Sequence, residues 1–194
     1  MNEHTIRQFD ADMEAVRTGV LTMGGLVEAQ FARAIGALEN DAAEGLIEQV
    51  GADERQINRM QIQIDQQCSQ IIARRQPTAG DLRMVLTIVK ITNDLERIGD
   101  LAVNISERTI ALGGAPSPSV AQRLLEMSKV GESMIRDGLA AFVAGDAGKA
   151  RHVFKRDQTV DDLFREIVLE MQAEMSREAK FVDRGIHIQA VAKF

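Results

Sequence analysis

Paired acidic side chains one helical turn apart are the residues of this sequence best suited to chemistry. Three pairs with metal-like spacing stand out, the last of which has an amide instead of a second carboxylate: Glu96 with Asp100, Asp157 with Asp161, and Glu54 with Asn58. Side chains at positions i and i+4 of a helix project from one side, with Cβ atoms about 5–6 Å apart. Two carboxylates at this spacing repel each other, so they shift their pKa values, pair with a cation or bind a metal ion. Their hard oxygen atoms suit Mg, Ca, Mn or Fe better than a structural zinc.

The same pairs are also compatible with a solvated helix surface. Glutamate and aspartate recur by chance at this spacing, and Arg97 or Arg108 could neutralise the first pair. Spacing alone leaves both interpretations open. The signature of a ferritin-like dimetal oxidase is missing, because no Glu or Asp stands three residues before any of the three histidines, His4, His152 and His187.

Residues 81–112, which carry the first pair, have two distinct sides when arranged as a helix. One side is apolar at alternating steps of four and three, the spacing of a helix packed against other helices. Its members are Met84, Ile88, Ile91, Leu95, Ile98, Ala102 and Ile105. The second side begins apolar and then becomes a stack of carboxylates and amides. Its members are Leu82, Leu86, Val89, Asn93, Glu96, Asp100 and Asn104. Because one side of this helix changes from apolar to acidic and amide side chains, we take residues 81–112 to carry the candidate functional site.

The composition favours a protein built of helices. Of the 194 residues, 45% are hydrophobic, 27% are charged and only 4% are aromatic. A core of Leu, Ile, Val, Met and Ala suits long packed helices better than sheets. The formal net charge of −6 argues against nucleic-acid binding, which usually needs a basic surface with aromatic side chains. The densest basic run, residues 149–156, is interpreted as the solvated side of a helix.

Several features indicate a cytoplasmic protein. The single cysteine, Cys68, excludes an intrachain disulfide, and its helical spacing from Ile64 and Ile71 predicts a small buried side chain. The N-terminal residues lack the apolar stretch of a signal peptide. No apolar run approaches the ~20 residues of a membrane span. We therefore expect a protein that is cytoplasmic and not itself transmembrane.

Turn-forming residues divide the chain into six predicted helices. The breaks fall at residues 40–41, at residues 76–80 around Pro77 and Gly80, at residues 113–118 and at residues 144–148. The helices cover approximately residues 6–38, 41–75, 81–112, 118–143, 160–180 and 186–194.

Individual residues near the breaks and along the apolar sides give further predictions about these helices. Asp41 and Glu44 have the spacing of a capping box, and Ser117 precedes a proline as an N-cap would. In the first helix the apolar spacing is regular apart from one additional step of four, between Val27 and Phe31. The sixth helix is expected to use Ile186, Ala190 and Val191 as its apolar side.

The second half of the chain repeats the first. Residues 54–58 align with residues 157–161, and residues 82–94 align with residues 182–194. We therefore expect an all-α fold of two tandem three-helix bundles, covering residues 1–114 and 115–194. On this alignment the chain stops just before the counterpart of Leu95–Asp100, so the sixth helix is expected to be truncated and to lack a second acidic stack.

The segment Asp94–Ile105, DLERIGDLAVNI, resembles the signature of the PhoU family of phosphate-uptake regulators. The opening His4-Thr5, the Gln76-Pro77 turn followed by residues 81–83, and the two-repeat plan are also similar to that family. The resemblance implies a cytoplasmic helical adaptor, expected as a homodimer, that represses phosphate uptake and the phosphate-starvation response. It also implies contacts with the ATPase subunit of the phosphate ABC transporter and with a membrane sensor histidine kinase.

The resemblance further implies that metal ions, Fe, Mg, Mn or Zn, bind at acidic E/D-x-x-x-D motifs. These motifs map onto Glu96 with Asp100 and onto Asp157 with Asp161, with Glu54 and Asn58 as a degraded third pair. Two other classes remain open: a carboxylate-bridged dimetal enzyme, and a helical scaffold or dimerisation protein without metal. No stretch is suited to cradle free phosphate, so we expect sensing to reside in the transporter or the kinase.

Overall fold

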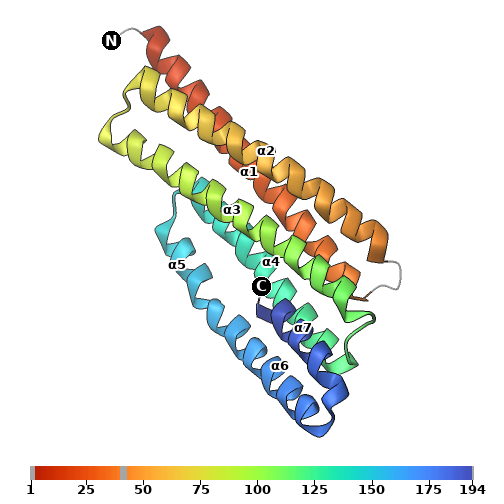
Figure 1. The fold of residues 1–194 in the computed structure, drawn as a ribbon. Coiled ribbons are helices and arrows are strands. Elements are labelled where there is room, and N and C mark those ends of the chain that lie inside the picture. The colour runs from red at the N-terminus through yellow and green to blue at the C-terminus, as the bar shows by residue number, and fades with distance from the viewer. Residues whose placement is uncertain (1–2, 40–42, 194) are drawn as a thin grey trace.

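The structure is a computed structural model that describes residues 3–39 and 43–193 (Figure 1). Every regular element in these ranges is a helix, which confirms the predicted all-α fold. The elements are α1 (Glu3–Glu39), α2 (Ala43–Arg75), α3 (Ala79–Leu112), α4 (Pro118–Ala144), α5 (Ala147–Lys155), α6 (Asp157–Arg177), the 3-10 turn η1 (Ala179–Phe181) and α7 (Val182–Lys193). No helix in the described ranges is long and apolar enough to cross a membrane.

Most of the helices end where the sequence predicts. Gly113 and Gly145 terminate α3 and α4 with φ of 62° and 61°, a left-handed conformation that favours glycine. Ser117 stands at the N-cap position of α4, although its hydroxyl makes no capping bond. The predicted turn at residues 76–80 is too long, because α3 already begins at Ala79, and the positive φ of 47° falls on Gln76. The capping box predicted at Asp41 lies outside the described residues.

The predicted fifth helix, residues 160–180, corresponds to α6, and a separate short helix, α5, precedes it. Helix α5 covers residues 147–155 and α6 covers residues 157–177, with the break at Arg156. The guanidinium of Arg156 is tied to α4, where its Nη1 lies 2.6 Å from an Asp137 carboxylate oxygen and its Nη2 contacts the Ser133 hydroxyl. The basic run at residues 149–156 lies mostly on the exposed surface of α5, which confirms its interpretation as a solvated helix side.

Helices α1, α2 and α3 form an antiparallel bundle along the upper part of Figure 1. Their shared core consists of buried apolar side chains, mainly Met13, Val16, Val20, Met23, Val27, Ile57, Ile64, Cys68, Ile71, Val85, Ile88 and Leu95. Cys68 is buried as predicted, and burial raises the pKa of its thiol to about 11. A thiol with so high a pKa is protonated at neutral pH and therefore poorly reactive.

A second apolar core joins the two halves of the chain. Helix α4 packs against α1, and α7 packs against both α3 and α6. The core contains residues from both sides of the predicted boundary at residues 114/115, among them Ala34, Ile105, Leu124, Ile167 and Val191. The division into two repeats stays a prediction drawn from the sequence. In the structure the second half packs on the first through this shared core.

The buried side of three helices differs from the predicted one. In α1 the spacing needs no additional step, because Gln30 and not Phe31 occupies the fully buried position after Val27. In α3 the buried positions include Thr92 and Gly99, whereas the predicted Met84, Ile91 and Ile98 are only half-buried. In α7, Ile186 is exposed, and Gly185 and Ile188 are buried instead. The prediction used apolar residues only, but a polar residue is also buried where it is hydrogen-bonded or small.

Candidate functional site

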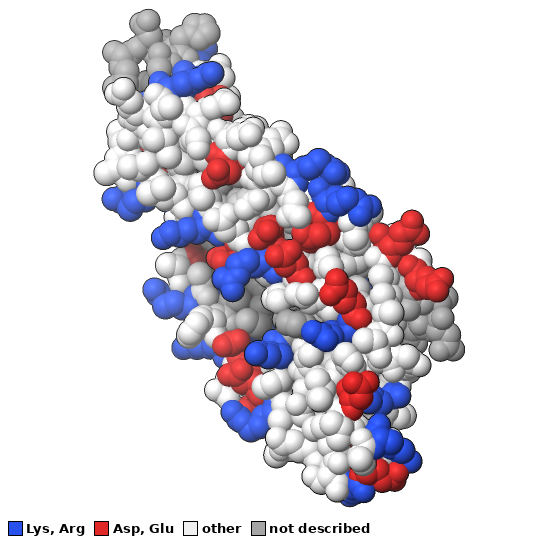
Figure 2. Space-filling view, in the orientation of Figure 1, with Lys and Arg blue, Asp and Glu red and all other residues white. Residues whose placement is uncertain are grey.

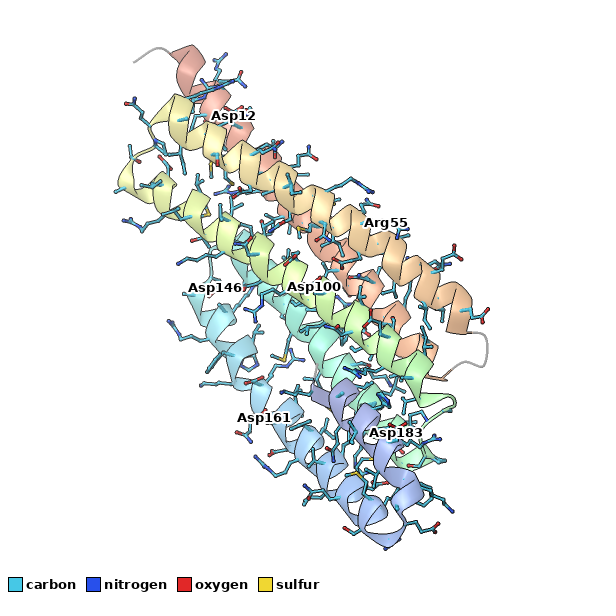
Figure 3. All side chains as sticks on the ribbon, viewed as in Figure 1. Asp12, Arg55, Asp100, Asp146, Asp161 and Asp183 are labelled. Atoms are coloured by element: carbon cyan, nitrogen blue, oxygen red, sulfur yellow. The ribbon has the colours of Figure 1, made fainter. Side chains whose placement is uncertain are left out.

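Polar side chains line the contact between α2 and α3. The two helices run antiparallel (Figure 3), so residue numbers rise along α2 in the direction in which they fall along α3. At one end the Gln61 amide donates to the Asn93 side-chain oxygen over 3.0 Å. We call the set Glu54, Asn58, Gln61, Asn93, Glu96 and Asp100 the α2–α3 polar seam. Figure 2 shows acidic side chains gathered over the middle of these helices, with basic side chains beside them.

Glu54 is held in place by two amide groups. Asn58 Nδ2 donates to one carboxylate oxygen over 2.8 Å, and Gln30 Nε2 donates to the other over 3.1 Å. The same Gln30 nitrogen also donates to the Val50 carbonyl over 3.2 Å. Gln30 belongs to α1 and has an exposed fraction of 0%, so α1 reaches the seam from the inside of the bundle. Its amide thereby fixes the carboxylate of Glu54 between α2 and α3.

Gly99 allows α3 to approach this arrangement closely. A Cβ atom at this position would lie 3.0 Å from Gln30 Oε1 and 3.0 Å from Glu54 Oε2. Both distances are shorter than ordinary van der Waals contacts. Gln30 Oε1 is buried and accepts no hydrogen bond from any described group. The lack of a side chain at Gly99 therefore allows α3 to pack close to Gln30 and Glu54.

Glu96 is influenced by carboxylates from both helices. Its pKa is raised above the ordinary value of 4.5, first by burial and then by the negative charges of Asp100 and Glu54, while Arg97 acts in the opposite direction. Three carboxylates, one from α2 and two from α3, thus act on one another. Their mutual repulsion favours a proton or a cation at this position.

The pair in the second half has different surroundings. Asp157 is the first residue of α6, directly after the break at Arg156, and Asp161 follows one turn later. Both side chains are exposed and neither has a hydrogen bond or ion pair with another described residue. Figure 3 separates Asp161 on α6 from Asp100 on α3. The structure therefore places the predicted residues in two groups, of which only the first is packed between helices.

The donor chemistry of the α2–α3 polar seam suits a hard cation, but its geometry is not that of a finished metal centre. Among the described residues, no group of three or more His, Cys, Asp or Glu side chains is arranged to hold a metal ion. Both oxygens of Glu54 already accept amide hydrogen bonds. Asp157 and Asp161 provide only two exposed carboxylates. Metal binding at either pair stays a prediction.

Two residues that support the seam, Gln30 and Gly99, were not found from the sequence, and neither was its member Gln61. Gln30 was missed because only apolar residues were counted along α1, although strict three–four spacing from Val20, Met23 and Val27 leads to it. Gly99 lies inside the segment that carries the family resemblance, and a glycine in a helix interior is itself a signal of close packing. Both signals were available in the spacing of α1 and α3.

Comparison with known proteins gives consistent matches along the chain. Residues 20–109 and 124–194 match the family model described as the PhoU domain. A phosphate-specific transport system accessory protein PhoU homolog of Pseudomonas putida is 39% identical over 194 residues, covering 97% of this chain and 73% of that protein.

Two solved structures share the fold. The crystal structure of PhoU from Pseudomonas aeruginosa has a TM-score of 0.89 at 38% identity, covering 95% of this chain and 88% of that one. The phosphate transport system regulatory protein PhoU from Streptococcus pneumoniae has a TM-score of 0.80 at 25% identity, covering 95% of this chain and 90% of that one. The Pseudomonas putida relative is named as an accessory protein and the Streptococcus pneumoniae one as a regulatory protein.

Proposed function

This chain belongs to the PhoU family, and on that premise we propose that it is a cytoplasmic negative regulator of phosphate uptake and of the phosphate-starvation response. It acts through protein contacts, one with the ATPase subunit of the phosphate ABC transporter and one with a membrane sensor histidine kinase, and it works as a homodimer. The observation that carries this proposal is the family match, which extends over both halves of the chain.

The physical character of the molecule supports a role in protein contacts and not in phosphate binding. The three long helices α1–α3 offer rigid, extended surfaces on which a partner can dock. The α2–α3 polar seam is the most distinctive polar feature, and its carboxylates would repel a phosphate anion. Phosphate is therefore sensed by the partners, and this chain transmits the state of one partner to the other.

We further propose that a divalent cation, Fe, Mn, Mg or Zn, binds at the α2–α3 polar seam. Glu96 and Asp100 are its predicted ligands, with Glu54 and Asn58 of α2 beside them, although as placed these side chains are not arranged to hold a metal ion. The support is the gathering of three carboxylates: the pKa of Glu96 is raised first by burial and then by the charges of Asp100 and Glu54, and a cation would offset the repulsion between them. Bound there, the ion would link α2 and α3 and stabilise their arrangement. Asp157 and Asp161 stay predicted metal ligands, but they supply only two carboxylates, fewer donors than the α2–α3 polar seam.

The regulatory proposal is tested in cells that lack their own copy of this regulator. We expect the tagged chain to restore repression of a starvation-induced promoter at high phosphate. We also expect it to co-purify with the transporter ATPase subunit and the sensor kinase. Two double variants are tested in the same cells, one with Glu96→Gln and Asp100→Asn and the other with Asp157→Asn and Asp161→Asn. They show whether either acidic pair is needed for repression or for partner binding. Failure to restore repression, together with recovery of neither partner, would refute the proposed function.

A further inference from the structure

Helix α5 differs in charge from the rest of the molecule. Residues 147–155 contain Lys149, Arg151 and Lys155 and no Asp or Glu, whereas the whole chain has a net charge of −6. All three cations are exposed, and none forms an ion pair with another described residue. Figure 1 places α5 along the left edge of the molecule, and Figure 2 shows Lys and Arg side chains at that edge. A positively charged helix is thus presented to the solvent by an acidic protein.

An aromatic side chain stands among these cations. Phe154 has an exposed fraction of 78%, whereas Phe9, Phe31, Phe142, Phe164 and Phe181 are all half-buried. Helix α5 has no buried residue, and its half-buried Val153 points to a different side from Phe154. The exposed phenyl ring therefore contributes little to the core of the protein.

Phe154 and two of the cations share one side of α5. At 100° per residue, Arg151 lies about 60° from Phe154 and Lys155 about 100° from it, while Ala147 lies between Phe154 and Arg151. Lys149 lies farther round the helix. The exposed side formed by Ala147, Arg151, Phe154 and Lys155 is called the α5 surface below. The long aliphatic arms of its cations can lie along an apolar layer while their charges stay in a polar one.

We propose that the α5 surface binds the anionic headgroups of a lipid bilayer. Phe154 enters the boundary between headgroups and acyl chains, while Arg151 and Lys155 contact the lipid phosphates. A partner protein that receives a helix in a groove usually takes several apolar anchors spaced along one side. The α5 surface has a single large one, and although α5 packs against α4, all four residues of this surface are exposed. These features suit a flat anionic surface better than a protein groove. The inference rests on α5 and does not depend on the proposed regulatory function.

Co-sedimentation with vesicles tests this proposal. The full chain is mixed with vesicles of neutral lipid or with vesicles containing roughly 30% phosphatidylglycerol, at about 0.05 M and 0.5 M salt. We expect binding to the anionic vesicles only, and loss of most of it at the higher salt. Arg151→Gln with Lys155→Gln should weaken the binding by about tenfold or more, and Phe154→Ser by about fivefold or more.

Matched variants elsewhere control for general effects of charge and apolarity. Ile110 has an exposed fraction of 64%, and Arg59 and Lys90 are exposed cations on other helices. Ile110→Ser, and Arg59→Gln with Lys90→Gln, should leave vesicle binding within about twofold of the unaltered chain. Because the chain contains no Trp, Phe154→Trp provides a single fluorophore. Its emission should shift to the blue and be quenched by brominated lipid, whereas that of Ile110→Trp should not.

Three results would overturn the proposal that the α5 surface binds anionic lipid. Absence of binding to anionic vesicles would do so, as would equal weakening by the control variants. Binding to poly-glutamate that requires Arg151 and Lys155, without binding to vesicles, would also overturn it and assign the α5 surface to an acidic protein. Thermal melts of all variants by circular dichroism establish that they are folded, as expected for substitutions at exposed positions.

Discussion

The α2–α3 polar seam and the pair Asp157 with Asp161 have related spacing in the sequence but different surroundings in the structure. Glu54 lies between three helices, where Gln30 and Asn58 donate to its carboxylate and Gly99 lets α3 approach. Asp157 and Asp161 lie exposed on α6, directly after the helix break at Arg156. The i,i+4 spacing orients both pairs, and only the packing of further helices brings one of them against a third carboxylate, so that Glu96 is half-buried while Asp100 stays exposed.

The largest expected difference between the two regions concerns Gln30. Gln30→Ala removes a fully buried side chain and both of its hydrogen bonds, so it should lower the free energy of unfolding by about 2–3 kcal/mol. Urea unfolding followed by far-UV circular dichroism measures this. Gln63→Ala, at an exposed position of α2, is the matched control and should change stability by less than about 0.5 kcal/mol. Equal effects of the two would mean that Gln30 does not support the seam.

The next effect concerns the close approach of α3. Gly99→Ala adds a Cβ that meets Gln30 and Glu54, at a cost of about 1–3 kcal/mol, from which the better helix propensity of alanine subtracts about 1 kcal/mol. We expect a net loss of about 1 kcal/mol. Gly25→Ala is the matched control, since nothing lies within 4 Å of the added Cβ there. It should be neutral or stabilising. A stabilising Gly99→Ala would contradict the packing described above.

A smaller effect concerns the charge of Glu96. Because its pKa is raised in the folded state, the folded protein holds this proton more tightly than the unfolded chain, and stability falls as the pH rises through the interval above 4.5. Glu96→Gln should therefore stabilise the protein at neutral pH by about 0.5 kcal/mol. The stabilisation by Glu96→Gln should disappear at pH values low enough for Glu96 to be protonated in both the folded and the unfolded chain. Thermal melts across acidic to neutral pH check the sign, and a loss of stability at neutral pH would contradict it.

The smallest effect is expected in the second half. Asp157→Asn with Asp161→Asn changes two exposed side chains without partners among the described residues, so the free energy of unfolding should change by less than about 0.5 kcal/mol. The same unfolding experiment measures it. A loss as large as that of Gln30→Ala would show that this pair is packed in solution, and the contrast between the two regions would then be wrong.

The sequence was sufficient for the fold class and for most helix boundaries, because glycine, proline and apolar spacing act locally. It also placed Glu96 and Asp100 correctly on one side of α3. The spacing along α1 leads to Gln30 as a buried position, but it does not reveal that Gln30 completes the site, because the hydrogen bonds of its side chain are made to another helix, α2. The break at Arg156 was missed for the same reason: the contacts of its side chain with Asp137 and Ser133 are made across helices.

Calorimetric titration with Mn²⁺ tests most directly whether the α2–α3 polar seam, and not the pair on α6, is the cation site of this protein. The unaltered chain is compared with Glu96→Gln plus Asp100→Asn and with Asp157→Asn plus Asp161→Asn. We predict that the unaltered chain binds Mn²⁺, that the first double variant loses this binding, and that the second retains it. Absence of binding to the unaltered chain, or loss of binding only in the second double variant, would contradict the account.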